Sequence, residues 1–576
     1  MAGSGVGRVS LARRRGWVAA VAALLVGGLA LINSTTAVSA TTVSVATEAE
    51  YRQALIDLSA DNSGPHVIEV TADITIVGAT DPAYNGTQPL TINGNGKAID
   101  ANGNSRFLNH DVSQALVIND LTVRNGSTGG SGGAVAANAT VEVNSSVFTG
   151  NSADGTGGAI DAGAVTASDC TFTQNRSGGP GGAINTSSGS ISADVTLTRC
   201  AITENVSNDG GAISATDTGA VVTVTGSRFE NNGDPINAPF TEDGGAIRGG
   251  EVKVTGSTFI GNSAENGGAV YTGGDDAQIV GSTFTGNTAT QGGGAISAGT
   301  TSVTGSTFVD NTVVDGNGGA IEADAADIID SLFDGNTAGE DNDGGAVYTG
   351  DGSVTIDGST FVRNTTSGDG EGGAVEASTN VTATNSTFTQ NTGGEDVINA
   401  EGDEGGGDVT LRYVTFVDNI TVQNDPQDGA IDSDGDGTLT SFGSVFGGNT
   451  PNTCEPDFGA VVSEGYNYAD DDSCGLNGGP GDVENGPDPK VEPLGDFGGP
   501  TPTRPPVLPD SPLIDAIPVA DCYPGIAVDQ RDLPRPEDGN LDGTNGCDIG
   551  AVEVQTQDSP TPTPPGPIAA RPTFTG

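Results

Sequence analysis

The sequence predicts an all-β protein, a single-stranded right-handed parallel β-helix whose coils stack along one axis. The chain repeats itself at roughly 24 to 30 residues, a period typical of solenoids. Each repeat holds three short β-branched or aromatic runs separated by Gly, Asn and Asp turns, which indicates three strands per coil. The repeats carry no apolar stripe with a period of 3.6 residues, so a helical repeat is excluded.

Residues 1–40 have the pattern of a secretory signal peptide. An arginine-rich start precedes an apolar run from Trp17 to Ile32, and Ala40 fits the small residue preferred at a cleavage site. We therefore expect an extracellular protein, secreted or associated with the cell surface or wall, whose mature chain begins near Thr41 and has no membrane span. An uncleaved signal anchor is the alternative.

The composition is strongly acidic, with 75 Asp and Glu against 20 Lys and Arg and a formal net charge of −55. Nucleic acid is not expected as a partner, because binding it requires cations that neutralise phosphates. An anionic membrane surface is disfavoured for the same reason. Divalent cations and basic surfaces are the natural partners of such a chain, and its charge favours solubility.

Residues 41–125 form the predicted N-terminal cap and first coils. The end of a solenoid must be covered, because its strand edges are unpaired. Thr47 and Glu50 match a helix capping box, and the helix that they would begin carries apolar residues along one face. Strands are expected at His66 to Val70 and Ile74 to Val77, followed by less regular coils.

Residues 126–449 form the predicted β-helix repeats, built from the words Ser-x-Phe-x-x-Asn and Gly-Gly-Ala-Ile/Val. The two words recur from Phe148 to Asn449 and from Gly132 to Gly372 respectively. Stacked coils place each residue over its counterpart about 4.8 Å away, so one chemistry must recur along each column. We expect inner ladders of Phe and of Ile/Val, hydrogen-bonded Asn amides, and positive φ at the Gly corners.

The residue after each Gly-Gly-Ala-Ile/Val word is expected to point outward, because its predecessor points into the core. This outer column consists of Asp161, Asn185, Ser214, Arg248, Tyr271, Ser297, Glu322, Tyr348 and Glu376. Arg248 beside Tyr271 is its most site-like pair and supplies the only catalytic candidates. We expect most of the column to be a solvated face, since no carboxylate pair stands out for acid–base chemistry.

Six cysteines in an exported chain predict disulfides. The favoured local pairs are Cys170–Cys200, Cys454–Cys474 and Cys522–Cys547. Cys170 and Cys200 replace the Ser of two consecutive repeats, which stacks them within the Cα range of disulfides, roughly 4.4 to 6.8 Å. A buried reduced pair is the alternative at that position.

Two acidic loops are candidate calcium sites, and calcium is the one cofactor that we expect. The first is Asp432, Asp434 and Asp436, followed by Gly437. The second is Asp538, Asn540 and Asp542, followed by Gly543, with Asp548 completing the set. Carboxylates at alternate positions converge on one hard cation, and Gly permits the tight turn. The alternative for each loop is a solvated acidic turn.

Two more segments follow the repeats. Residues 450–555 are richer in Pro, Asp and Cys and form a predicted C-terminal module. Residues 556–576 are Pro/Thr-rich and form a predicted disordered, polyproline-like tail.

The Gly-Gly-Ala-Ile and Phe-x-x-Asn repeats resemble those of the chlamydial polymorphic membrane proteins. That family uses a pectate-lyase-like β-helix as a surface-exposed adhesin passenger, so the resemblance implies the pectin lyase fold and an adhesive role. It covers about residues 130–449 and is more specific for fold than for function.

The C-terminal module resembles the choice-of-anchor Q domain of bacterial surface proteins. The matching segments are Leu494–Thr503, Ser511–Asp515, Asp529–Arg531, Arg535–Pro536 and Asp548–Glu553. Such a domain typically precedes a cell-surface anchor, so the resemblance implies a surface protein.

The leading hypothesis is a non-catalytic surface protein, adhesin-like or envelope-structural, whose ligand is a polysaccharide or a host or envelope surface. The alternative is a calcium-assisted polysaccharide lyase or glycoside hydrolase. A lyase requires a cation beside the uronate carboxylate and a base such as Arg or Lys. The only Trp of the chain, Trp17, lies in the predicted signal peptide, which leaves no Trp to line sugar subsites.

Overall fold

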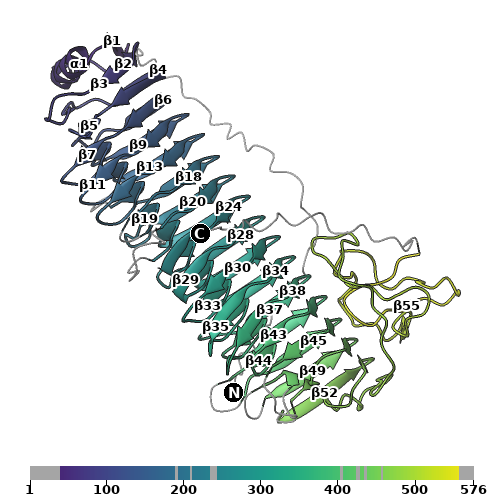
Figure 1. Cartoon of the computed structure of the whole chain (residues 1–576). Helices are drawn as coiled ribbons and strands as arrows, with labels where there is room; N and C mark the ends of the chain where they lie inside the picture. The colour runs from purple at the N-terminus through teal and green to yellow at the C-terminus, as the bar shows by residue number, and fades with distance from the viewer. Residues whose placement is uncertain are drawn as a thin grey trace, which may run out of the picture. The chain divides into compact units, whose positions relative to one another are not determined.

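The computed structural model describes residues 39–187, 193–207, 210–233, 243–402, 406–422, 429–433, 437–455 and 458–556. Their strands stack in parallel and in register as a β-solenoid of about 16 turns, and they include a single α-helix (Figure 1). The predicted fold class, an all-β right-handed parallel β-helix, is confirmed. The predicted signal peptide and most of the Pro/Thr-rich tail lie outside the described residues.

The first ladder follows the Gly-Gly-Ala-Ile/Val words. It consists of β5 (Leu108–His110), β8 (Val135–Ala137), β12 (Ile160–Ala162), β16 (Ile184–Thr186), β19 (Ile213–Ala215), β22 (Ile247–Gly249), β26 (Val270–Tyr271), the starts of β30 (Ile296–Thr304) and β33 (Ile321–Ile329), β36 (Val347–Thr349), β40 (Val375–Ala377), β44 (Ile398–Ala400), β48 (Gly429–Ile431) and β51 (Asn452–Cys454). Its Ile and Val side chains point inward.

The second ladder holds the short β-branched runs. It consists of β1 (Thr41–Val45), β2 (His66–Val70), the starts of β4 (Leu90–Asp100) and β6 (Leu116–Arg124), β9 (Thr140–Asn144), β13 (Ala164–Ser168), β17 (Val195–Thr198), β20 (Val221–Thr225), β23 (Glu251–Thr255), β27 (Ala277–Val280), the ends of β30 and β33, β37 (Val354–Asp357), β41 (Val381–Thr384), β45 (Val409–Arg412), β49 (Thr438–Phe442) and β52 (Ala460–Gly465).

The third ladder follows the Phe words. It consists of β3 (Ile74–Thr75), the ends of β4 and β6, β10 (Val147–Thr149), β14 (Thr171–Thr173), β18 (Ala201–Thr203), β21 (Arg228–Glu230), β24 (Thr258–Ile260), β28 (Thr283–Thr285), β31 (Thr307–Val309), β34 (Leu332–Asp334), β38 (Thr360–Val362), β42 (Thr387–Thr389), β46 (Thr415–Val417), β50 (Val445–Gly447) and β53 (Tyr468–Ala469).

Short strands also line the loop between the Phe and Gly words. One group is β7 (Ser127–Thr128), β11 (Ser152–Ala153) and β15 (Arg176–Ser177). The other is β25 (Ser263–Asn266), β29 (Thr288–Gly292), β32 (Thr312–Val313), β35 (Thr337–Glu340), β39 (Thr365–Ser367), β43 (Thr392–Gly393) and β47 (Ile420–Thr421). The sequence did not predict this fourth short strand in each coil, which pairs with its neighbour through one to three residue pairs.

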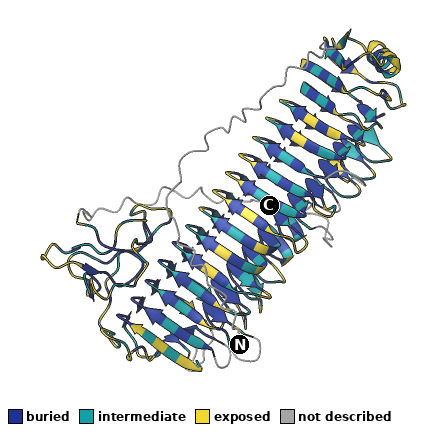
Figure 2. Ribbon diagram, turned by 180° about the vertical axis from the view of Figure 1, so that it is seen from behind, coloured by how far each residue is buried: buried dark blue, intermediate teal, exposed yellow. Residues whose placement is uncertain are grey.

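The core is an internal column of side chains, and buried and less buried residues alternate along the strands (Figure 2). From Phe229 to Phe388 the rings stack face to face, with centroids 4.7 to 4.9 Å apart. This spacing equals the distance between coils. The predicted Phe ladder is therefore present, and each ring covers the next.

The predicted Asn ladder is also present. Asn311 Nδ2 donates to Asn336 Oδ1 at 2.9 Å and to Phe284 O at 3.1 Å, while Asn311 Oδ1 accepts from the backbone N–H of Asn287 at 3.0 Å. The same pattern repeats along the ladder from Asn151 to Asn449. Each buried amide thus satisfies backbone groups of neighbouring coils as well as its own polar atoms.

The Gly corners have the predicted left-handed conformation. Gly157, for example, has φ 63°, and a Cβ atom there would lie 2.3 Å from the carbonyl oxygen of Ile160. Both the dihedral angle and the lack of space require glycine at this corner.

The N-terminal cap has the predicted form. Helix α1 (Glu48–Ala60) begins after Thr47, whose hydroxyl accepts the N–H of Glu50 at 3.3 Å. Its apolar face, which includes Tyr51 and Leu55, is buried against the first coils. Tyr51 OH donates to Phe107 O at 3.2 Å, which fixes the helix over the open end of the solenoid.

Two of the three predicted disulfides are confirmed, with Cα distances of 4.9 Å for Cys454–Cys474 and 5.9 Å for Cys522–Cys547. The predicted Cys170–Cys200 disulfide is wrong, because both residues are buried free thiols in neighbouring coils.

These two thiols act as the serines of their column do. Cys170 Sγ contacts Ser168 O at 3.1 Å, just as Ser227 Oγ donates to Thr225 O at 3.1 Å. The coil-to-coil stacking that we inferred is present, but each thiol is directed to a backbone carbonyl two residues earlier. Stacking alone therefore did not imply a covalent bond.

The regular coils continue past Asn449, through β53, before the chain leaves the solenoid. The following residues carry one short antiparallel pair, β54 (Ile517–Pro518) and β55 (Gly546–Cys547). They lie beside the later coils in Figure 1, where Gln530 Nε2 donates to Ser359 O at 3.0 Å and Thr360 Oγ1 at 2.8 Å.

Candidate functional site

The outer column of the first ladder is the best candidate site. Its residues follow the inward-pointing Ile or Val of each coil, and the register pairs Arg248 with Tyr271, Tyr271 with Ser297, and Glu322 with Tyr348. Contrary to our expectation of a solvated face, much of this column is sheltered. Ser214 and Glu376 are only 1% exposed, because the Gly corners lie against them: a Cβ atom at Gly210 would be 3.1 Å from Ser214 Cβ, and one at Gly372 would be 2.7 Å from Glu376 Cβ.

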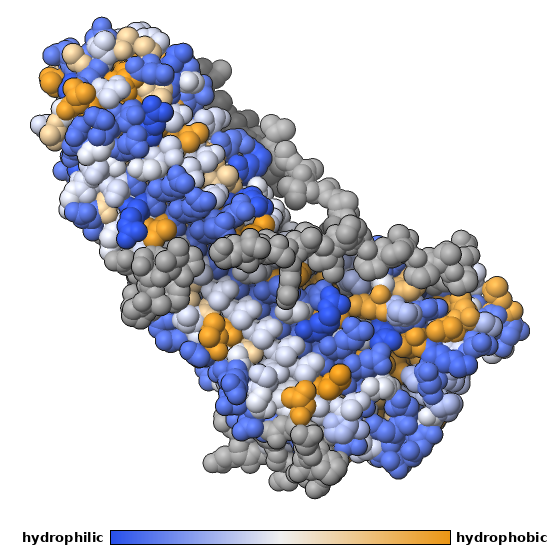
Figure 3. Space-filling model, viewed as in Figure 1, coloured by the Kyte–Doolittle hydropathy of each residue, from blue (hydrophilic) through white to orange (hydrophobic). Residues whose placement is uncertain are grey.

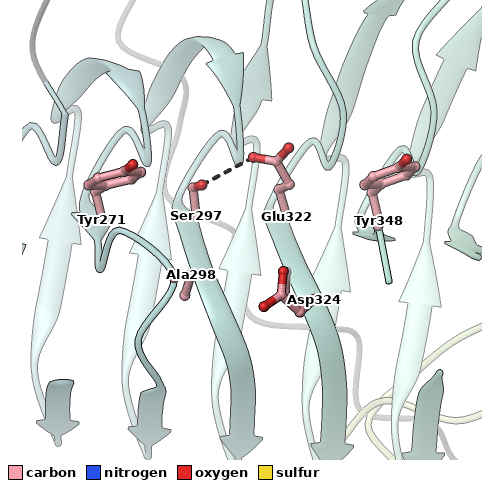
Figure 4. A pocket seen from close by; sticks show the side chains of 9 residues that line it. Tyr271, Ser297, Ala298, Glu322, Asp324 and Tyr348 are labelled. Atoms are coloured by element: carbon pink, nitrogen blue, oxygen red, sulfur yellow. Dashed lines mark hydrogen bonds between the residues drawn. The ribbon is translucent and has the colours of Figure 1, made fainter. Parts of the chain in front are cut away.

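A groove of about 220 Å³ lies at the centre of this column. Figure 4 shows Tyr271 and Tyr348 at its two ends, with Ser297 and Glu322 between them. Ser297 Oγ donates to Glu322 Oε2 at 3.1 Å. Because the four residues belong to successive coils, the two tyrosines are about 14 Å apart along the axis, three coil spacings of about 4.8 Å.

The electrostatics of the groove are acidic. Burial raises the pKa of Glu322, and the neighbouring charge of Asp324, another lining residue, raises this pKa further. Burial also raises the pKa of the Tyr348 hydroxyl, which therefore stays protonated at neutral pH. The groove thus offers two aromatic rings, a hydroxyl donor and carboxylate acceptors within one short row.

The predicted catalytic pair lies at one end of this row. Arg248 Cζ is 5.9 Å from the centroid of the Tyr271 ring, and Arg248 Nη2 is 3.8 Å from Asp243 Oδ2. Sequence reasoning placed Ser297, Glu322 and Tyr348 in the outer column but did not single them out. The usable signal was the recurrence of Tyr at the same column position, three coils after Tyr271.

A second acidic group lies further along the same column. Glu376 pairs directly with Asn399 in the next coil. Ile431 pairs with Ile398, so Asp432, the residue after Ile431, occupies the position of Asn399 one coil further on. Asp396 lies beside them. Burial, together with the negative charges of neighbouring carboxylates, raises the pKa of both Glu376 and Asp396 well above the usual value.

The two predicted calcium loops have different outcomes in the structure. Of the first, only Asp432 is described, since Asp434 and Asp436 lie outside the described residues. In the second, the carboxylate of Asp538 accepts the N–H groups of Asp542 at 3.1 Å and Gly543 at 2.9 Å. Across the described ranges, no three His, Cys, Asp or Glu side chains converge as a preformed metal site.

Asp548 and Asn540 lie in different environments. Asp548 is fully buried, and its two oxygens accept the N–H groups of Asp515 at 2.6 Å and Val554 at 2.7 Å. Asn540 lies in the loop with Asp538, where its side-chain oxygen accepts the N–H of Asp542 at 2.9 Å. Asp548 thus belongs to the interior of the C-terminal module, with both oxygens engaged.

Comparisons with known proteins agree with the fold. Residues 42–177 match the family model of a putative pectate lyase-like adhesive domain. Residues 169–187, 256–273, 281–299 and 330–350 match the Chlamydia polymorphic membrane protein repeat. No curated protein and no solved structure matches the chain.

The chain is therefore similar to pectate-lyase-like adhesive β-helices, and its repeats are similar to those of the polymorphic membrane proteins, as the sequence predicted. The groove residues Tyr271, Ser297 and Tyr348 all lie within matched repeats. The resemblance of the C-terminal module to the choice-of-anchor Q domain stays a prediction. Within the described ranges, no helix is long and apolar enough to cross a bilayer.

Proposed function

We propose that this protein is a non-catalytic cell-surface adhesive protein that binds an extended glycan in the groove between Tyr271 and Tyr348. The match of residues 42–177 to an adhesive domain model and the four polymorphic-membrane-protein repeats support a surface-adhesive role. The row of aromatic and polar side chains in Figure 4 is the observation that carries the ligand class.

This row suits a sugar chain better than a protein ligand. The apolar face of a sugar ring packs against a tyrosine ring, and its hydroxyl groups donate to carboxylates such as those of Glu322 and Asp324. The parallel register repeats the groove floor at every coil, so an extended polymer contacts several coils at once. Figure 3 shows a mainly hydrophilic surface on the face in view, in keeping with a polar ligand.

The acidic groove also favours some glycans over others. Glu322 and Asp324 repel carboxylate-bearing sugars, and the chain as a whole has a net charge of −55. We therefore propose a neutral or amino-sugar polymer as the ligand.

The alternative of a polysaccharide lyase receives less support from Arg248. An arginine stays protonated in proteins, and the carboxylate of Asp243 lies 3.8 Å from its guanidinium. Both factors oppose a role as the base that removes a proton from a uronate. A positively charged Arg248 beside Tyr271 suits ligand binding at the end of the groove.

A glycan array followed by calorimetry tests the proposal on the full chain. Tyr271→Ala and Tyr348→Ala are each expected to weaken binding of the selected glycan about tenfold, equal to about 1.4 kcal/mol. Thr283→Ala, on the third ladder of the Tyr271 coil, is the matched control and leaves affinity unchanged. Absence of any bound glycan, or binding insensitive to both tyrosines, contradicts the proposal; release of new reducing ends or unsaturated product favours the enzyme.

A further inference from the structure

The C-terminal module contacts the third ladder through a Pro-Thr-Pro-Thr-Arg segment, residues 500–504. This segment lies against the outer face of β38, β42 and β46, which we call the docked face. Thr501 Oγ1 donates to Gly358 O at 3.1 Å. Thr360 Oγ1 in turn donates to Pro502 O at 2.6 Å. Both contacts are made on the coil of β38.

Arg504 extends the contact to the next two coils. Its Nη1 atom donates to Thr389 Oγ1 at 2.8 Å on β42 and pairs with the carboxylate of Asp418, which follows β46. Thr501 and Arg504 each precede a proline, which favours an extended backbone. The segment therefore crosses three coils, and each coil supplies a carbonyl, hydroxyl or carboxylate to it.

Three earlier coils carry the same contact groups at the same positions. We call the outer face of β24, β28 and β31 the open face; its strands stack in register as those of the docked face do. Its words are Gly-Ser-Thr-Phe-Ile, Thr-Phe-Thr and Thr-Phe-Val-Asp, against Gly-Ser-Thr-Phe-Val, Thr-Phe-Thr and Thr-Phe-Val-Asp on the docked face. The groups that match Gly358, Thr360, Thr389 and Asp418 are Gly256, Thr258, Thr285 and Asp310.

The two faces differ in burial. Thr360 and Thr389 are 0% exposed, because the module covers them. Thr258 and Thr285 are partly exposed, and Asp310 is exposed. The backbone is nevertheless alike, with φ 52° at Asp310 and 59° at its counterpart on the docked face. The open face thus repeats the polar contact groups of a surface that holds a peptide segment, without being covered by the module.

A single aromatic anchor explains why the module lies on the docked face. Tyr413, at the corner before β46, has the guanidinium of Arg535 4.0 Å from its ring. Gly305 occupies the same position before β31. The open face therefore lacks the contact that would hold the module, but keeps the contacts that hold an extended segment.

We propose that the open face docks an extended segment of a partner protein that carries a Thr and, three residues later, an Arg. Charge complementarity supports such a segment, because Asp310 and an arginine form a charge-assisted hydrogen bond. The net charge of −55 also attracts basic partners. This surface lies on the third ladder, whereas the proposed glycan groove lies on the first, so the two ligands occupy different faces.

Fluorescence anisotropy tests the docking on the full chain, with a labelled peptide of the sequence of residues 499–506, Gly-Pro-Thr-Pro-Thr-Arg-Pro-Pro. We expect saturable binding of one peptide per chain. Thr258→Val and Thr285→Val each remove one hydrogen bond and are expected to weaken binding about threefold. Asp310→Asn is expected to weaken it about tenfold. A peptide with Ala in place of Arg is expected to bind the wild type and Asp310→Asn equally weakly.

Two variants locate the binding. Thr203→Val changes the same column position in a coil whose next neighbour has Asn231 where the open face has Asp310, and is expected to leave affinity unchanged. Asp418→Asn changes the docked face. Absence of peptide binding by the wild type, or binding lost in Asp418→Asn and retained in Asp310→Asn, overturns the proposal. Self-association of the full chain in sedimentation velocity that disappears in Asp310→Asn also overturns it, because a second copy then occupies the open face.

Discussion

The β-helix repeats and the C-terminal module both bury polar groups, but they satisfy them in different ways. In the repeats, each Asn of the ladder is held by the Asn of the next coil, as Asn311 is by Asn336 at 2.9 Å. In the module, buried ion pairs take this role: Arg535 pairs with Glu553 at 3.2 Å, and Arg531 pairs with Asp529 at 3.0 Å. The repeats satisfy their buried polar groups with neutral amides, and the module satisfies its own with charged pairs.

This difference determines how a substitution affects each region. When one Asn of the ladder is lost, the groups left without a hydrogen-bond partner are neutral amides. The module concentrates charge: Arg535 also lies 4.0 Å above the Tyr413 ring, and burial raises the pKa of Glu553 to about 7. We expect substitution of a buried polar residue to lower the free energy of unfolding moderately in the repeats and strongly in the module.

The largest effect is expected for Arg535→Ala. This change leaves Glu553 and Asp548 buried without their cation, which typically costs about 3–5 kcal/mol. Hydrogen exchange measured by mass spectrometry is expected to show loss of protection in residues 470–556 while the repeats stay protected. Arg199→Ala removes an exposed pair with Asp169 at 2.7 Å and is expected to leave the free energy of unfolding nearly unchanged, because water and salt screen such a pair. Equal losses in the two variants contradict the comparison.

An intermediate effect is expected for Asn311→Ala in the middle of the Asn ladder. The change leaves the backbone N–H and the side-chain amide of Asn287 without their acceptor, at an expected cost of about 2–3 kcal/mol. Urea unfolding followed by circular dichroism gives the free energy of unfolding. Asn342→Ala, at a partly exposed Asn outside the ladder, is the matched control and is expected to change stability by less than about 0.5 kcal/mol. A cost for Asn311→Ala as small as that of the control argues against the ladder.

The smallest effect is expected for Cys170→Ser and Cys200→Ser. Serine occupies this column in the neighbouring coils and donates to the same backbone carbonyl, so each change is expected to alter stability by less than about 1 kcal/mol. Titration of the unfolded, unreduced wild type with a thiol reagent is expected to find two free thiols, and the double variant none. Absence of titratable thiols in the wild type means that these cysteines form a disulfide after all.

The repeats could be predicted from the sequence because stacking forces one residue type into each column. Phe308 and Asn311, for example, mark a coil whose neighbours repeat the same spacing, and both lie where the pattern predicts. The cap helix beginning at Glu48 was also predictable, because its capping residues and apolar face are local signals.

The module and the groove could not be predicted in the same way. The buried pair of Arg535 and Glu553 joins residues 18 positions apart in a segment without periodicity. The groove depends on how closely the loops approach the strands, and the sequence does not specify this. Ser214, for example, is buried, although we expected the column to be solvated. Cys170 and Cys200 take the orientation of the serines in their column, and that column position did not indicate whether the two thiols are oxidised.

The Asn ladder has a consequence for how such chains change over evolutionary time. Within the ladder, each inner amide contacts an identical amide on either side, as Asn311 contacts Asn287 and Asn336. Unequal recombination that duplicates or deletes one whole coil of this region therefore restores the amide contacts of the ladder at the new junction. The solenoid is thus free to lengthen or shorten in steps of one coil, while the helix that caps its N-terminal end stays unchanged.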